Sequence, residues 1–288
     1  MKQKFNDSNF IEKCGFLLLY LCIGVALLFL LVIIYFIFSR GVQIISWEFL
    51  TQPPRDAMKS GGIAPAILGT FYLTIGAIIV ALPLGVASAI FLCEYSPDSY
   101  VVNIIRTGIN NLAGVPSVIF GLFGLSIFVK FFGFGVSILS GSLTLGILIL
   151  PGIISATQEA LISVPQSLRE ASVALGATQW KTIKKIVLPT ALPGILTGVI
   201  LSIGRAAGET APILFTAATF YTKNYPNSIF SETMALPYHI YALMTEGAFP
   251  QQQTKIAYGS ALVLLTLVLA ISAIAIYIRE KQRKTYVY

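Results

Sequence analysis

The chain has 288 residues, of which 56% are hydrophobic and 11% are charged. Soluble globular domains carry about 25% charged residues. This composition, with a mean hydropathy of +0.82, excludes a cytosolic enzyme, a disordered chain and a secreted disulfide scaffold. The net charge of +7 is compatible with a nucleic-acid binder or a membrane protein. We predict an all-α polytopic membrane protein whose residues 1–288 form a single transmembrane domain.

Six apolar stretches are each long enough to cross a bilayer as a helix, which takes about 20 residues. In chain order they are Phe16–Phe38, Pro65–Leu92, Leu112–Val129, Ile138–Ala156, Ala191–Ala218 and Ile256–Ile278. Six transmembrane helices place both termini on the same side. Several of these stretches contain Pro and Gly, which a membrane tolerates only where neighbouring helices or a water-lined cavity satisfy the freed backbone. We therefore predict packed helices that move past each other.

The distribution of basic residues sets the orientation. Twelve of the 19 Lys and Arg residues fall on the side of the termini, six fall on the other side, and one lies inside a predicted span. Cytoplasmic loops carry the basic excess, so we predict a multi-pass protein of the cell membrane with both termini in the cytoplasm. The positive charge then reflects topology and attraction to anionic membrane lipid, and we expect no nucleic-acid partner.

The predicted outer segment between the last two spans, residues 221–255, is long and mixed. Leu236, Ile240 and Leu243 recur in it at helical spacing, which predicts a short helix lying at the outer interface. His239 is the single histidine. We expect it at a surface or an interface and not as a metal ligand or proton relay.

Residues 163–176 predict a short cytoplasmic helix. Ser163 is expected to cap it, with Gln166 completing a capping box and Pro165 in the first turn. Gly176 suits the left-handed position that ends a helix. One face of this helix carries Leu168, Ala171, Ser172 and Leu175.

A second short helix follows, for which Thr178 is the predicted cap. Its apolar face holds Trp180, Ile183 and Val187, its opposite face holds Lys181, Lys184 and Lys185, and Leu188–Pro189 is expected to stop it. Two interpretations are open for this pair of helices joined by a glycine elbow. It is either an amphipathic connector that covers helix ends or a surface that couples the bundle to a cytoplasmic partner.

The spacing of Glu170, Ala171, Ser172, Gly176, Ile186 and Leu188–Pro189 resembles the EAA loop of ATP-binding-cassette (ABC) importer permeases. It departs from that pattern at Ser172, where alanine is usual. The resemblance implies a type I ABC importer permease fold in which residues 163–189 form the coupling segment, seated in a groove of a cytoplasmic ATPase. The contact residues it implies are Leu168, Arg169, Glu170, Ala171, Ser172, Leu175 and Gly176.

Three further stretches, Gly61–Thr70, Ala113–Gly124 and Arg205–Ala217, are similar to the phosphate-specific permeases, the PstA type more than the PstC type. The resemblance covers a core of about 61–280. It implies a PstC-like companion permease, a PstB-like ATPase dimer that uses ATP and Mg, and a PstS-like phosphate-binding protein. The chain has no Gly-Lys pair and therefore no P-loop, so we expect a transport subunit that is not an enzyme and binds no cofactor itself.

Arg205 and Glu209 are the charged residues that lie deep in an apolar run. A charge there costs about 2.5–3.5 kcal/mol on insertion scales, and the i, i+4 spacing brings the two within reach of each other. One interpretation is a structural ion pair that fixes the rotation of the helix. The other is a phosphate translocation site in which Arg205 offers forked donors, Glu209 accepts a hydrogen bond from monohydrogen phosphate, and Ser202 and Thr210 supply hydroxyls.

Two alternative functions are open at this point. A permease for another oxyanion, such as molybdate or sulfate, would use the same parts. A self-sufficient channel or ion-coupled transporter would predict more intramembrane carboxylates or inverted repeats, and the sequence shows one such carboxylate and no repeat.

Overall fold

The computed structural model describes residues 2–96, 99–222 and 224–286. The described chain is mostly helical, as predicted, and the sole sheet in this part pairs β1 (Pro54–Arg55) with β2 (Ser60–Gly61). Five helical stretches are long and apolar enough to span a membrane, and a bent helix pair makes up to six. The five are Gly15–Gly41, Ala64–Tyr95, Ile138–Ile162, Gln179–Gly208 and Pro250–Lys281.

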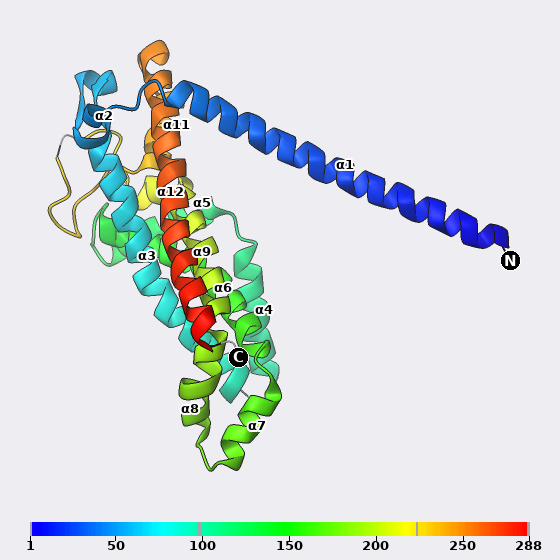
Figure 1. Ribbon diagram of the computed structural model, residues 1–288. Coiled ribbons are helices and arrows are strands. Elements are labelled where there is room, and N and C mark those ends of the chain that lie inside the picture. Colours follow the sequence, from blue (N-terminus) through cyan, green and yellow to red (C-terminus); the bar gives the residue numbers. More distant parts are fainter. Residues whose placement is uncertain (1, 97–98, 223, 287–288) are drawn as a thin grey trace.

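The centre of the bundle is built from α3 (Ala64–Ile90), α6 (Ile138–Ile162), α9 (Leu188–Gly208) and α12 (Pro250–Tyr286). Figure 1 shows these helices running side by side. α3 packs along α6, and α6 in turn packs along α9. The core between them is apolar, with Leu73, Leu145, Ile149 and Ile153 almost fully buried.

Small residues bring α9 against α6. A Cβ added at Gly194 or Gly198 would overlap Ala160 or Ala156 of α6, so the GxxxG spacing at these glycines allows the close approach that it predicts. The second GxxxG does not behave in this way. A Cβ added at Gly204 would have its nearest neighbouring atom at 3.9 Å, and one added at Gly208 would meet no atom within 4 Å.

The third predicted span, Leu112–Val129, is wrong as a single straight helix. α4 (Tyr100–Ala113) and α5 (Ser117–Gly124), which continues into the π-helical segment η3 (Leu125–Phe131), meet at a bend of 103°. Pro116 explains the break, because proline lacks a backbone donor and disfavours helical geometry in the residue before it. The bend places the amphipathic α4 at a steep angle to α5.

The fifth predicted span, Ala191–Ala218, also differs. α9 ends at Gly208, and a separate short helix, α10, covers Ala211–Thr216. At the other end, Leu188–Pro189 does not stop the preceding helix, because α8 (Gln179–Thr182) continues through the π-helical segment η4 (Ile183–Val187) into α9. Pro189 lies just after the π-helical turn of η4, where the regular α-helical hydrogen-bond ladder is already interrupted.

The outer end of the bundle carries α2 (Trp47–Thr51), the β1–β2 hairpin and α11 (Leu236–Thr245). The helix predicted around Leu236, Ile240 and Leu243 therefore exists. Leu236 and Leu243 are buried against the bundle, because α11 packs against α12 and α3. The expectation of a surface position for His239 is wrong, since its side chain is buried with 2% exposure.

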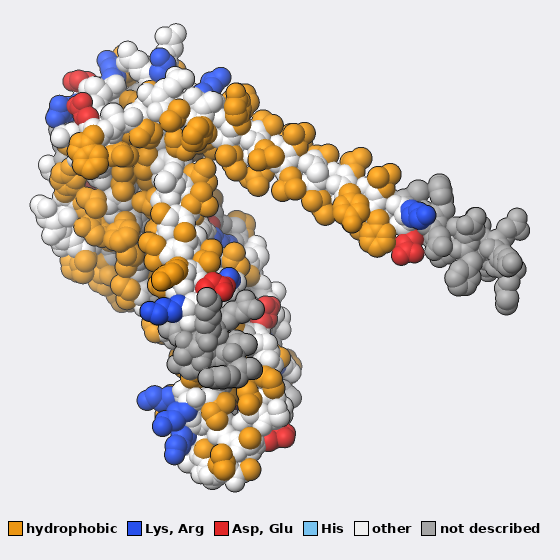
Figure 2. Space-filling view, viewed as in Figure 1, with side chains coloured by type: hydrophobic (Ala, Val, Ile, Leu, Met, Phe, Trp, Pro, Cys, Tyr) orange, Lys and Arg blue, Asp and Glu red, His pale blue; other side chains and the backbone are white. Residues whose placement is uncertain are grey.

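α1 (Lys2–Gly41) stands apart from the bundle. Figure 1 shows it joining the other helices only near its carboxyl end, where Gly41 lies against the backbone of Tyr258 in α12. The apolar stretch Gly15–Gly41 has none of its most apolar window buried. Figure 2 shows hydrophobic side chains along the surface of this helix.

Candidate functional site

The predicted coupling segment lies at the end of the bundle opposite α2 and α11, which the predicted orientation makes the inner end. There α7 (Gln166–Ala174) and α8 form a helical hairpin (Figure 1). The predicted capping box is wrong. Pro165 occupies the N-cap position of α7 without a side-chain hydrogen bond. Ser163 still has helical dihedral angles at the end of α6, and its hydroxyl donates to the carbonyl oxygen of Ala160 at 2.8 Å. Ser163 therefore belongs to the end of α6, and it does not cap α7.

The glycine elbow is confirmed. Gly176 has φ +79°, the left-handed geometry that favours glycine. The amide of Ala177 donates to the carbonyl of Ser172, and the amide of Gly176 donates to that of Val173, which together make a Schellman motif. Thr178 caps α8 through the amide of Lys181, as the sequence predicts.

The two helices of the hairpin divide their side chains between solvent and protein. Of the apolar face predicted for the second helix, Ile183 and Val187 of η4 are buried, whereas Trp180 of α8 is exposed. The three lysines predicted on the opposite face are exposed. Figure 2 shows basic side chains gathered at this end of the molecule. Five of the predicted contact residues are exposed on the hairpin, and we call them the docking surface: Leu168, Glu170, Ala171, Leu175 and Gly176. Leu175 is the most exposed of them, at 89%.

Two of the implied contact residues point inward instead. Ser172 is buried, and its hydroxyl lies 2.8 Å from that of Thr182 in α8. Arg169 donates from Nη1 to the carbonyl of Val164 at 2.6 Å and from Nη2 to that of Leu161 at 2.8 Å. Ser172 therefore joins the two helices of the hairpin to each other, and Arg169 holds the hairpin against the bundle.

Arg169 also forms an ion pair that the sequence did not predict. Its Nη2 lies 2.9 Å from Oε1 of Glu94, with both side chains largely buried. Glu94 belongs to the π-helical segment η2 (Phe91–Tyr95), which continues α3. The available signal was a carboxylate at the inner end of an apolar run. Its partner, 75 residues away, was beyond the reach of any local pattern.

The intramembrane pair forms, although not within one helix. Nε of Arg205 lies 3.6 Å from Oε1 of Glu209. Arg205 is in the last turn of α9, whereas Glu209 is its extended C-cap residue and Thr210 precedes α10. Pro212 explains the break, because it has no amide to donate to the carbonyl of Gly208.

The break leaves the pair between solvent and protein. The side chain of Arg205 is 44% exposed and that of Glu209 is 17% exposed. Glu209 lines a small cavity together with Thr70 and Thr74 of α3. Ser202 is buried and donates to the carbonyl of Gly198 at 2.9 Å, so its hydroxyl proton is already used within α9.

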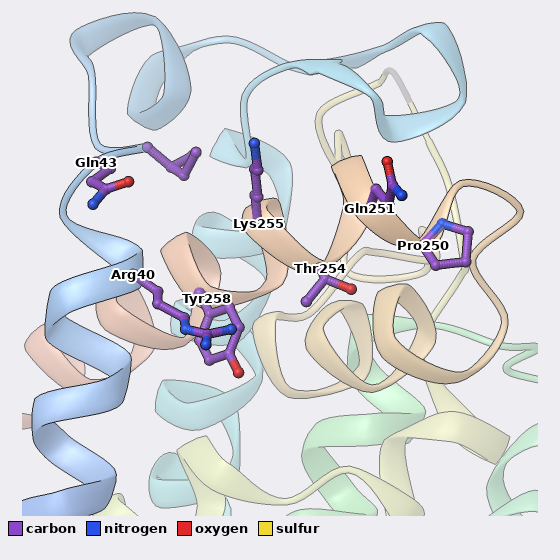
Figure 3. Close-up of a pocket in the computed structure, with 8 residues that line it drawn as sticks. Arg40, Gln43, Pro250, Gln251, Thr254, Lys255 and Tyr258 are labelled. Carbon is purple, nitrogen blue, oxygen red and sulfur yellow. The ribbon is translucent and has the colours of Figure 1, made fainter.

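A separate pocket of about 610 Å³ lies at the outer end, where α1 meets α12. Figure 3 shows Arg40 from α1 beside Tyr258, and Lys255 one turn away on α12. The guanidinium of Arg40 lies over the rings of Tyr258 and Phe36, at 5.3 and 5.5 Å from their centroids. Aromatic and basic side chains of this kind anchor helices at a membrane interface. Neither Arg205 nor Glu209 lines this pocket.

Comparison with known proteins identifies the family. Residues 81–283 match the family described as binding-protein-dependent transport system inner membrane component. The chain belongs to this family. The probable ABC transporter permease protein YqgI of Bacillus subtilis is 35% identical over 258 residues, covering 86% of this chain and 88% of that protein. The phosphate transport system permease protein PstA of Xylella fastidiosa is 35% identical over 247 residues, covering 84% of each chain.

The fold agrees with this assignment. A bacterial alginate ABC transporter, solved with an alginate-bound periplasmic protein, superposes with a TM-score of 0.64 at 17% identity, covering 90% of this chain and 92% of that chain. The architecture is that of type I ABC importer permeases, and the chain is a multi-pass membrane subunit of such an importer. Permeases of this family work with a separate ATPase and a binding protein.

Proposed function

We propose that this chain is the permease subunit that forms half of the translocation pathway of an ATP-driven phosphate importer. The observation that carries the proposal is the 35% identity to a PstA phosphate permease over 84% of both chains. The partners would be a PstC-like permease, a PstB-like ATPase dimer that binds ATP and Mg, and a PstS-like phosphate-binding protein. Both termini would lie in the cytoplasm, and residues 1–288 would form one domain.

The docking surface supports the coupling role. Leu168, Glu170 and Leu175 are exposed on a hairpin that Arg169 joins to the bundle and that Ser172 ties together internally. Leu168, Ala171 and Leu175 recur at i, i+3 and i+7, the spacing with which a helix enters a groove of a partner protein. We infer that ATP binding moves the ATPase subunits and thereby displaces α7, so that the bundle alternates between inward and outward access.

The Arg205–Glu209 pair supports an anion pathway. A half-exposed guanidinium offers planar donors that match phosphate oxygens. The 3.6 Å separation leaves the pair loose enough for an anion to compete for Arg205. Glu209 would accept the hydrogen bond of monohydrogen phosphate, and Thr210 would contribute a hydroxyl at the helix break. Ser202 would act through its neighbours, since its proton is donated to Gly198.

Reconstitution tests the proposal. The chain with its three partners in liposomes should take up radiolabelled phosphate only when ATP is present inside, with little competition from sulfate or molybdate. Arg205→Gln should abolish uptake and leave the complex assembled, because this variant removes the donor fork without touching the docking surface. Arg55→Gln is the matched control, since this arginine pairs with Glu48 on the outer surface.

Three results would contradict the proposal. Uptake by the chain alone would indicate a self-sufficient transporter. Strong competition by another oxyanion would indicate that this oxyanion, and not phosphate, is the preferred substrate. Normal uptake in the Arg205→Gln variant would return the Arg205–Glu209 pair to a structural role.

A further inference from the structure

The inner end of α3 is held by side chains from three other helices. The carboxylate of Glu94 pairs with Arg169 of α7. The backbone carbonyl of Glu94 accepts from the side-chain amide of Gln179 in α8. The carbonyl of Leu92 accepts from Nη2 of Arg106 in α4 at 2.8 Å. We call the segment Phe91–Tyr95 with these three partners the hub.

The π-helical geometry of the hub explains why it can be held in this way. The last carbonyl groups of a helix have no partner within the helix, and π-helical turns recur at functional sites. Here the free carbonyls of η2 accept from side chains that belong to the coupling hairpin and to α4. A displacement of α7 and α8 therefore pulls directly on the end of α3.

α3 connects the hub to the region of the intramembrane pair. The helical stretch Ala64–Tyr95 is a single span, so Glu94 and Thr74 are separated by about 30 Å of helix at 1.5 Å per residue. Thr70 and Thr74 line the cavity that Glu209 also lines. The hydroxyl of Thr70 in addition accepts from the amide of Leu236 at the start of α11. One continuous helix, which contains Pro83 between Thr74 and Glu94, thus joins the coupling hairpin, the Glu209 cavity and the outer helix.

The Glu94 carboxylate does more than complete the fold of the hairpin. Arg169 already donates to the carbonyls of Leu161 and Val164, which hold α7 against the end of α6. Glu94 adds a charge-assisted bond from the same guanidinium to a different helix. With side chains only 17% and 11% exposed for Arg169 and Glu94, this bond is weakly screened by water and salt.

We propose that Glu94 is a positioning residue for energy coupling. Its ion pair with Arg169 transmits the displacement of the α7–α8 hairpin to α3, and α3 carries that displacement to the Glu209 cavity. This inference rests on the proposed function, because it assumes that an ATPase drives the hairpin.

The test uses the assembled, reconstituted complex with ATPase rate and phosphate uptake measured in the same vesicles. Glu94→Gln keeps the size of the side chain and removes its charge. We expect the phosphate transported per ATP hydrolysed to fall by about tenfold, within the range of coupling energies between distant sites, while the ATPase rate and the subunit stoichiometry are retained. A purely structural role would lower both rates together through loss of complex.

A matched control and a double-mutant cycle isolate the pair. Glu280→Gln removes a carboxylate that also pairs with an arginine, Arg279, but within a single helix, and it should leave the ratio unchanged. Arg169→Gln combined with Glu94→Gln should be no worse than the more defective single variant, since both remove the same link. Additive losses in the double variant would contradict the proposal.

A second variant keeps the test valid if Glu94→Gln fails to assemble. Gln179 is exposed, and Gln179→Ala removes one hub bond without leaving a buried charge, so it should lower the ratio by a smaller factor. A wild-type ratio in every assembled hub variant would overturn the role of Glu94 and leave the proposed function intact. Absence of ATP-driven uptake in the wild-type complex would overturn the proposed function instead.

Discussion

At the residue scale, burial separates side chains that are adjacent in the coupling segment. Arg169 and Glu170 are neighbours, yet Arg169 bonds to the ends of α6 and α3 while Glu170 is exposed. The EAA spacing assigned both to the ATPase contact, because a motif gives positions and not directions. Arg169→Ala is therefore a poor probe of ATPase contact, and Glu170 and Leu175 are better ones.

His239 gives a pH-dependent prediction at the same scale. Burial lowers its pKa from 6.5 to about 4, and neither ring nitrogen has a hydrogen-bond partner among the described residues. The folded state thus favours neutral imidazole, while the unfolded chain takes up a proton below pH 6.5. Stability from this residue should be complete above pH 6.5 and fall by about 3 kcal/mol as the pH drops from 6.5 to 4.

Thermal unfolding in detergent measures this effect. Between pH 6.5 and 4, the melting temperature of the wild type should fall further than that of the His239→Leu variant, which has no group to protonate at this position. α11 lies outside the apolar spans, so the pH of the buffer is the relevant variable. Identical pH profiles for the two proteins would show that His239 is already solvated.

At the element scale, two glycines of α9 offer a matched comparison. A methyl group at Gly198 would overlap Ala156 of α6, whereas one at Gly204 meets its nearest atom at 3.9 Å. Gly198→Ala should destabilise the bundle by about 1–3 kcal/mol through overpacking. Gly204→Ala should be neutral or stabilising by up to about 1 kcal/mol, since alanine is the better helix former. Melting temperatures of the two variants test this comparison. Equal shifts would contradict the close contact between α9 and α6 at Gly198.

The elements show how far sequence reasoning extends. Apolar runs located the spans at Ile138–Ala156 and Ile256–Ile278 because hydrophobicity and length are sufficient there. They failed at Leu112–Val129 and Ala191–Ala218, where Pro116 and Pro212 interrupt runs that remain apolar throughout. Hydropathy does not register a missing backbone donor, so a broken helix and a straight one give the same profile.

In the candidate site, too, local features were predictable from the sequence and long-range contacts were not. Gly176 and Thr178 were predictable because local backbone chemistry fixes them. The hub was not predictable, since it joins Glu94, Arg106, Arg169 and Gln179 from four separate elements. Such long-range pairing depends on how α3 packs against α6, which a periodic pattern does not encode.

At the scale of the whole molecule, orientation is the testable property. With both termini in the cytoplasm, Leu175 and Ser228 lie on opposite sides of the membrane. In a cysteine-free background, Ser228→Cys should react with a membrane-impermeant maleimide in intact cells, and Leu175→Cys should react only after permeabilisation. The reverse labelling pattern would invert the topology and remove the docking surface from the ATPase.

The isolation of α1 has a consequence for how the importer is assembled in the cell. Among the described residues, the helix meets the bundle near its carboxyl end, around Gly41 and Tyr258. Its apolar side chains from Phe16 to Phe36 are exposed and offer the bilayer a long apolar surface. A copy synthesised without its companions would present a loosely tethered segment to membrane quality-control proteases. Balanced production of all the subunits should therefore matter more for the lifetime of this chain than its own bundle stability.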